Sequence, residues 1–312
     1  MEHLRLCLIS FTQCPGVGVL VGAASGIFYS TSGAFAKLLT GSVDPVTISA
    51  IRSFLISFFS FIICIIRRTN FFEIKKIEVA VSLFCGVLAT TFTISWFYSC
   101  QMINFSDVMT LVGTGPMFII FINGFLFKIK PTVLEIITVI LCVVSITLCT
   151  QPDFIFHPEV NELEHGTLGK FLALLAAFAI GLLVVLYQHT PNLDCFIFMT
   201  IHHGTAVFLS LLFMAIFGMF NGPEVPIDYA YLISNGVVST ASVLLYLVAV
   251  RIDSALMASI GRTSDVLAGL VYGVTLFHQV PNALSISAAV LLVFAIILPA
   301  LVRGCLFRSN SS

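Results

Sequence analysis

The chain has 312 residues, of which 59% are hydrophobic and only 9% are charged, and its mean hydropathy is +1.09. A soluble globular domain is about 45–50% apolar and about 25% charged, so a single water-soluble core could not bury this surplus. The 14 basic and 15 acidic residues nearly cancel, which argues against a nucleic-acid partner. The composition excludes a soluble enzyme, a nucleic-acid-binding protein and a disordered chain. It predicts an integral membrane protein with many spans.

Ten apolar segments follow one another along the chain, each about 20 residues long, which is the length a helix needs to cross a bilayer. The runs are continuous rather than alternating, which favours helices over a β-barrel. Short breaks with turn residues or charges separate them. The expected spans are 17–38, 47–66, 79–98, 106–127, 131–150, 168–187, 196–217, 229–250, 254–276 and 283–302.

The two halves of the chain match at a constant offset of 150 residues. The matches run without a gap and pair Gly86 with Gly236, Thr90 with Thr240, Trp96 with Tyr246, Phe127 with Phe277 and Pro131 with Pro281. A unit with five spans must lie in opposite orientations in its two copies. The fold class expected is therefore all-α integral membrane, with ten helices in two inverted five-helix repeats. The repeats are placed at 17–150 and 168–302, with an outer linker at 151–167 and a short tail at 303–312.

Basic residues predict how the chain lies in the membrane. With a cytoplasmic amino terminus, the cytoplasmic segments hold ten lysines and arginines, and the opposite side holds only Lys170. This is a strong positive-inside bias, and it predicts that both termini are cytoplasmic.

Three stretches of the sequence carry a family resemblance. The first is Ser32-Gly33-Ala34-Phe35-Ala36-Lys37-Leu38, followed by Asp44-Pro45-Val46 and Ile51-Arg52. The second runs from Asn104-Phe105-Ser106-Asp107 to Gly115-Pro116-Met117-Phe118, and the third from Arg251-Ile252-Asp253-Ser254 to Arg262-Thr263-Ser264-Asp265. On these motifs the chain resembles the drug/metabolite transporter superfamily with its two EamA-type repeats, and within it the solute carrier family 35 G-type subgroup.

The resemblance implies a ten-helix transporter of small molecules, and it departs from the superfamily at one point. Many members have a Gly-Glu pair after the fourth and ninth spans. Here Phe127-Lys128 and Phe277-His278 stand at those positions, so any role of that glutamate is absent.

Ionisable groups inside a span cost about 2.5–3.5 kcal/mol each at its centre, so each needs a reason. Arg52 falls on His202 at the repeat offset, and the two could clamp a carboxylate or phosphate. Alternatively, Arg52 extends its side chain to the outer interface, as is expected for Lys37. Arg262 and Asp265 lie three residues apart, either as a structural pair or as a substrate site, and Asp265 is also a candidate for proton coupling. Protonation of His202 is a candidate for gating, whereas the adjacent His202 and His203 lack the spacing of metal ligands.

Gly113-Thr114-Gly115-Pro116 interrupts the fourth span. Pro116 removes a backbone donor, and Gly113 and Gly115 permit bending or close approach. The repeat offset pairs this interruption with Thr263-Ser264-Asp265-Val266. Matched interruptions in two repeats indicate a solute site, although ordinary small-residue packing is the alternative.

No catalytic, metal-binding or cofactor motif is recognisable in the sequence. The predicted function is a secondary, non-ATP-driven carrier that moves a small polar, anionic solute across the lipid bilayer by alternating access. The alternative is a non-transporting regulator that binds another membrane protein. The sequence does not identify the solute or the coupling ion. It also leaves open whether the protein lies in the plasma membrane or in the endoplasmic reticulum or Golgi, and whether it has a homodimer or regulatory partner.

Overall fold

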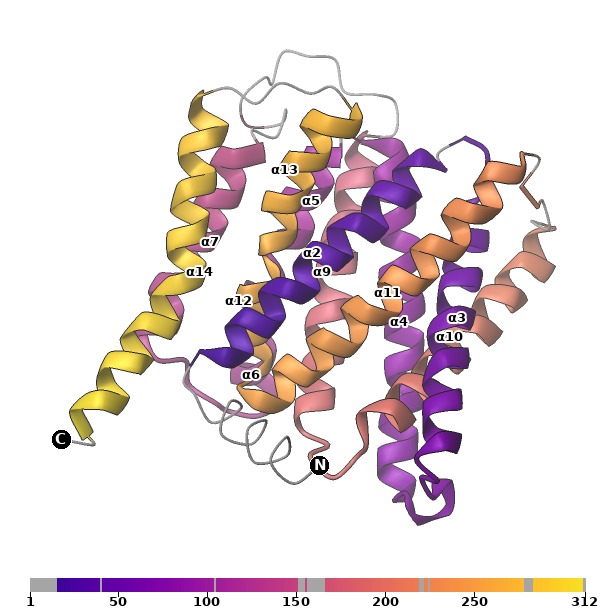
Figure 1. Ribbon diagram of the computed structural model, residues 1–312, viewed down its shortest axis with the longest axis horizontal. Coiled ribbons are helices and arrows are strands. Elements are labelled where there is room, and N and C mark those ends of the chain that lie inside the picture. Colours follow the sequence, from indigo (N-terminus) through magenta and orange to yellow (C-terminus); the bar gives the residue numbers. More distant parts are fainter. Residues whose placement is uncertain are drawn as a thin grey trace.

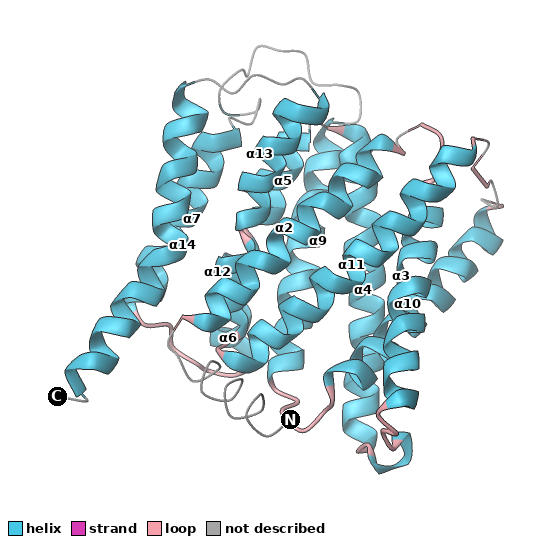
Figure 2. Cartoon of the chain, in the orientation of Figure 1, coloured by secondary structure: helices cyan, strands magenta, loops and turns pink. Residues whose placement is uncertain are grey.

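The computed structural model describes residues 16–39, 41–103, 105–150, 155, 166–218, 222–223, 225–277 and 283–310. Within these ranges the chain forms helices joined by turns and short loops, and it has no strand (Figure 2). The all-α prediction is therefore confirmed for the described residues. Most of the linker expected at 151–167 lies outside them.

The helices follow the expected spans closely. The first half contains α2 (Val17–Leu38), α3 (Pro45–Ile66), the short 3₁₀ helix η1 (Phe71–Glu73), α4 (Lys76–Met102), α5 (Phe105–Gly113), α6 (Gly115–Leu126) and α7 (Val133–Thr150). The second half contains α9 (Gly166–Gln188), α10 (Cys195–Phe217), α11 (Pro226–Ile252), α12 (Ala255–Arg262), α13 (Ser264–Phe277) and α14 (Ala283–Asn310). The last helix continues well into the segment expected to be a tail.

Local sequence signals set several helix boundaries. Asp194 is the N-cap of α10, and its carboxylate accepts hydrogen bonds from the backbone N–H groups of Phe196 and Ile197. Pro45 and Pro226 open α3 and α11, where a missing backbone N–H costs nothing. The starts of α3, α4 and α7 recur 150 residues later as the starts of α10, α11 and α14. The offset found in the sequence is thus also an offset of helix boundaries.

The fourth and ninth expected spans are each two helices rather than one. Thr114 separates α5 from α6, and Thr263 separates α12 from α13. Each threonine donates its backbone N–H and its side-chain hydroxyl to the carbonyl three residues earlier, with hydroxyl distances of 2.6 Å. The two interruptions therefore have the same local geometry. An offset of 150 residues would pair Thr114 with Ser264. The hydrogen bonds instead make Thr263 the equivalent of Thr114, because these bonds define where each helix breaks.

Contacts between helices join the two halves in matched pairs. Helix α2 packs along α11, α12 and α13, and α9 packs along α4, α5 and α6. Helix α3 lies against α10, and α7 lies against α14 (Figure 1). The contacts that α2 makes with the second half thus correspond to the contacts that α9 makes with the first half. Helix α6 ends at the lower edge of Figure 1, whereas its counterpart α13 ends at the upper edge.

Glycines on α2 allow α12 and α13 to approach closely. A Cβ atom added at Gly22 would lie 2.5 Å from the carbonyl oxygen of Ala258, and one at Gly26 would lie 2.4 Å from the carbonyl oxygen of Arg262. On the other side of this contact, a Cβ at Gly261 would meet the carbonyl oxygen of Val19. Small residues let membrane helices approach backbone to backbone. This contact fixes the position of Arg262 at the end of α12.

Six of the described helices have the length and apolar composition that crossing a membrane requires, namely α2, α3, α4, α9, α10 and α11. Large apolar side chains such as Phe54, Phe121 and Phe208 are exposed on the outside of the bundle. Such a belt is expected where lipid replaces water as the solvent. The chain is a multi-pass membrane protein.

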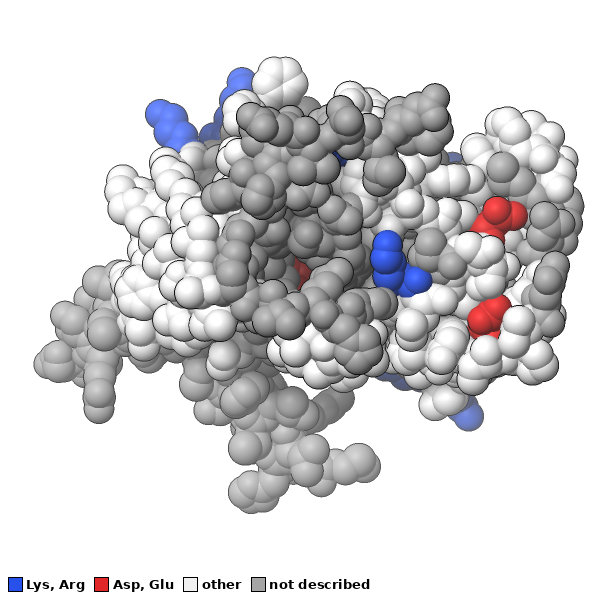
Figure 3. Space-filling model, turned by 90° about the horizontal axis from the view of Figure 1, so that it is seen from above, with Lys and Arg blue, Asp and Glu red and all other residues white. Residues whose placement is uncertain are grey.

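The two ends of the bundle differ in charge. The helix ends at the lower edge of Figure 1 carry most of the described basic residues: Arg67, Arg68, Lys75, Lys76, Lys128, Lys130 and Arg251. The upper face carries scattered charges of both signs among its described side chains (Figure 3). Lys37 lies at this end and donates from Nζ to the carbonyl oxygen of Cys100 at 3.0 Å, so it has a local structural partner.

Candidate functional site

Arg52 lies inside the bundle and does not extend to the interface. It is 2% exposed, and its Nε donates to Oγ of Ser239 at 2.8 Å. Its Nη1 donates to Oγ1 of Thr93 at a longer 3.4 Å. These partners belong to α11 and α4, so Arg52 connects three helices from both halves of the chain. The alternative in which Arg52 extends to the outer interface is wrong, because the hydroxyl groups of neighbouring helices replace the interfacial water.

A chain of small polar groups continues from Arg52 towards α2. Oγ of Ser239 also lies 2.8 Å from Oγ of Ser32, and Nδ2 of Asn235 donates to the carbonyl oxygen of Ser32 at 2.7 Å. Oδ1 of Asn235 and Oγ of Ser53 are buried, and neither has a hydrogen-bond partner. Unsatisfied buried polar atoms are costly, and in native proteins they indicate bound water, ions or a functional ligand. The region around Arg52 is polar and incompletely satisfied.

The two histidines differ in their surroundings. His202 is buried, its Nδ1 lies 2.7 Å from the carbonyl oxygen of Phe198, and its ring packs on the Phe198 ring. His203 is also buried, but neither of its ring nitrogens has a hydrogen-bond partner. Both rings interact electrostatically with Arg52. The sequence singled out His202 as the partner of Arg52, whereas His203 is the histidine with unused hydrogen-bonding atoms.

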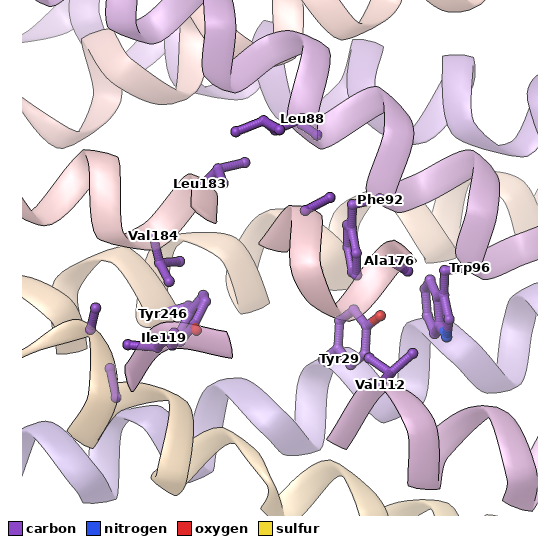
Figure 4. Close-up of a cluster of buried hydrophobic side chains, with 14 of the residues drawn as sticks. Tyr29, Leu88, Phe92, Trp96, Val112, Ile119, Ala176, Leu183, Val184 and Tyr246 are labelled. Carbon is purple, nitrogen blue, oxygen red and sulfur yellow. The ribbon is translucent and has the colours of Figure 1, made fainter. Parts of the chain in front are cut away.

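Arg262 is held by aromatic rings. Its guanidinium carbon lies 4.0 Å from the centre of the Tyr29 ring, 5.0 Å from that of Tyr246 and 5.9 Å from that of Phe92. Cation–π contacts of this kind are worth about 2 kcal/mol or more when desolvated. Figure 4 shows Tyr29, Phe92 and Trp96 grouped closely, with the Tyr29 and Trp96 rings stacked at 4.4 Å. The rings compensate part of the cost of burying the charge.

Asp265 does not neutralise Arg262 by direct contact. The described residues contain no contact ion pair between the two, although their charges interact. Arg262 ends α12 and Asp265 lies in the first turn of α13, beyond the break at Thr263. Asp265 is 5% exposed and its Oδ1 has no hydrogen-bond partner. The expected pair on one helical face is therefore replaced by two separately held charges, because the helix does not continue between them.

A small cavity joins the two helix breaks. It has a volume of about 20 Å³, which is room for about one water molecule. Its lining includes five of the seven residues singled out in the sequence: Gly113, Gly115, Pro116, Arg262 and Asp265. The other two, Arg52 and His202, do not line it. Arg52 instead contacts Ser239 and Thr93, neither of which lines this cavity.

Sequence reasoning missed the groups that surround these charges. Tyr29, Phe92 and Ser239 carry no local motif, and their role depends on contacts between helices far apart in the chain. The sequence marks Tyr246 only as the repeat partner of Trp96. Within the described residues there is no group of three or more His, Cys, Asp or Glu side chains that could hold a metal ion.

Known proteins resemble this chain in sequence and in fold. Residues 16–151 match the EamA-like transporter family. The chain is similar to a solved crystal structure with a TM-score of 0.72 and 14% sequence identity, covering 91% of this chain and 96% of the other. At this identity the structural likeness shows the fold alone. The first half of the chain therefore resembles membrane transporters of the EamA-like family.

Two curated relatives make the resemblance more specific. The chain is 23% identical over 285 residues to solute carrier family 35 member G1 of Homo sapiens and to the protein of the same name of Mus musculus. The alignments cover 90% of this chain and 78% and 77% of the two relatives. The chain is therefore similar to the EamA-like transporter family and to the solute carrier family 35 G-type subgroup, which is the resemblance that its sequence motifs predict.

Proposed function

We propose that this protein is a secondary carrier in which two inverted five-helix repeats give a small anionic solute access to each side of the membrane in turn. The observation that carries the proposal is the burial of Arg52 and Arg262 at the junction of the two halves, with few acidic groups to balance them. Buried arginines bind carboxylate and phosphate groups with charge-assisted hydrogen bonds. The helix breaks beside Arg262 supply the irregular backbone that transporters use at solute sites.

The direct test is uptake of a metabolite panel by cells or proteoliposomes that contain the protein. Arg52→Ala is expected to reduce uptake of the transported anion at least tenfold, because a charge-assisted contact is worth more than about 1.4 kcal/mol. Lys130→Ala, at an exposed position outside the bundle, is the control and is expected to transport normally. Unchanged metabolite pools together with normal uptake by Arg52→Ala would contradict the carrier proposal.

The inverted arrangement has its own test. Epitope tags inserted after Phe127 and after Phe277 are expected to be accessible from opposite sides of the membrane, because these residues end equivalent segments of the two repeats. The tag after Phe127 is expected on the cytoplasmic side, where the basic residues and both termini are proposed to lie. Tags that report the same side would rule out the inverted repeats.

The second candidate is a membrane regulator that does not transport. Such a protein has no need for polar groups at its centre, and it would be favoured by arginines that face the lipid headgroups. Arg52, His202 and Arg262 are instead buried, which supports the carrier. The small volume of the central cavity fits a closed state of a carrier and also a packed regulator. The uptake experiment separates the two.

A further inference from the structure

A groove runs along the lipid-facing side of the contact between α3 and α10. It has a volume of about 410 Å³ and is lined by Phe54, Ser57, Phe58, Phe61, Thr200, Gly204 and Val207. The three phenylalanines on its α3 wall are each roughly half exposed. The groove lies on the outside of the bundle, away from the buried arginines.

A departure from the internal repeat opens this groove. Gly204 stands 150 residues after Phe54, so the second repeat has no side chain where the first has a phenyl ring. A Cβ atom added at Gly204 would make only an ordinary contact, 3.5 Å from Oγ of Ser57. Close packing of the helices therefore does not require a glycine here. The missing side chain instead leaves space between the helices on the lipid side.

The walls of the groove present apolar surface. The hydroxyl of Ser57 donates to the carbonyl oxygen of Thr200 at 3.1 Å. The hydroxyl of Thr200 donates to the carbonyl oxygen of Phe196 at 2.8 Å. Both hydroxyl groups are thus satisfied by the protein backbone. The rings of Phe54 and Phe58 stack with centroids 5.8 Å apart. Such a surface suits a hydrocarbon chain better than a polar ligand.

The groove is lined by the middle of α3 and by the part that leads towards its carboxyl end, from Phe54 to Phe61. Phe54 lies near the middle of α3, and Arg67 caps its carboxyl end. The 13 residue steps from Phe54 to Arg67 span about 20 Å at 1.5 Å per residue. Half the hydrocarbon core is about 15 Å thick, so an acyl chain whose tip reaches the middle of α3 places its headgroup near Arg67.

Basic residues lie beyond the lower end of the groove, at the end of α3 and in the connection that follows it. Arg67 is 54% exposed, and its guanidinium carbon lies 5.3 Å from the centre of the Phe196 ring, one turn beyond Thr200. Arg68, Lys75 and Lys76 are also exposed in the same connection. Of the nearby acids, Asp194 lies 3.7 Å from Arg67 and caps α10, and Glu78 accepts from the backbone N–H of Lys75. Glu73 accepts from Nδ2 of Asn70.

We propose that the α3–α10 groove is a binding site for an anionic phospholipid of the leaflet at the basic end of the bundle. One acyl chain lies between the three phenylalanines of α3 and Gly204 of α10. The phosphate lies beside Arg67 and Arg68. Basic clusters where membrane helices end are suited to anionic headgroups, and each Lys or Arg near the surface contributes about 1 kcal/mol. The site is independent of the solute site and rests only on the protein's place in a membrane.

The test compares dioleoyl phosphatidylglycerol with dioleoyl phosphatidylcholine, which have the same chains and differ in headgroup charge. Each lipid is added to the purified full-length protein in detergent, and bound lipid is counted by native mass spectrometry while thermal unfolding is recorded. Phosphatidylglycerol is expected to raise the unfolding midpoint by about 3–5 °C more than phosphatidylcholine does. Equal effects of the two lipids would overturn the proposal.

Two variants and two controls locate the site. Gly204→Leu fills the groove and Arg67→Gln/Arg68→Gln removes the charges, and each is expected to weaken phosphatidylglycerol binding about tenfold or more. Thr91→Leu fills the other outer groove, between α4 and α10, and Lys128→Gln/Lys130→Gln removes two charges from a different connection at the same end. Both controls are expected to keep the preference. Retention of the preference in Gly204→Leu would overturn the site.

Discussion

Arg262→Met is expected to abolish uptake and to destabilise the protein. The variant removes the cation held by the Tyr29 and Tyr246 rings and leaves Asp265 buried without a nearby positive charge. A buried polar group left without a partner costs about 1–3 kcal/mol, and more when it is charged. The loss of a charged contact to the solute is expected to lower uptake about thirtyfold or more. Thermal unfolding in detergent and uptake into proteoliposomes measure the two effects separately.

The double variant Arg262→Met/Asp265→Asn decides whether these charges bind solute or only balance each other. It removes both charges, so stability is expected to return towards that of the unmodified protein. Uptake is expected to stay lost if Arg262 contacts the solute. Recovery of uptake together with stability would show that Arg262 and Asp265 are a structural pair and would remove both from the solute site.

Gly22→Val is expected to separate α2 from α12. Its Cβ would lie 2.5 Å from the carbonyl oxygen of Ala258, which is part of the backbone and cannot rotate away. Overpacking of this kind costs about 1–3 kcal/mol or more. Because α12 ends at Arg262, the displacement is expected to reduce uptake as well as thermal stability and the amount of folded protein in the membrane.

Gly124→Val is the matched control for this glycine. A Cβ atom at Gly124 has its nearest neighbour, the carbonyl oxygen of Ile129, at 4.0 Å. The same substitution in another helix is therefore expected to leave stability and uptake nearly unchanged. If Gly22→Val behaves like this control, the close approach of α2 to α12 does not position the site.

The apolar segments predicted from the sequence agree with the helices because hydropathy and breaks are properties of a single stretch of chain. The span expected at 17–38 has the same bounds as α2, and most other ends agree within a few residues. The sequence places interruptions of the fourth and ninth spans at 113–116 and 263–266, because glycine, proline and polar residues are unusual inside a membrane helix. Their pairing was misplaced by one residue, because equivalence depends on backbone hydrogen bonds.

The sequence by itself determined that this protein lies in a membrane, where its helices run and which ionisable groups are buried within them. The tertiary structure decided where those groups point and what surrounds them. In helices that are apolar on nearly every face, periodicity does not distinguish the side that faces lipid from the side that faces the other repeat. The rings around Arg262, the inward direction of Arg52 and the unpartnered nitrogens of His203 all arise from contacts between distant helices. Those contacts depend on close packing at residues such as Gly22, and the local sequence does not specify their partners.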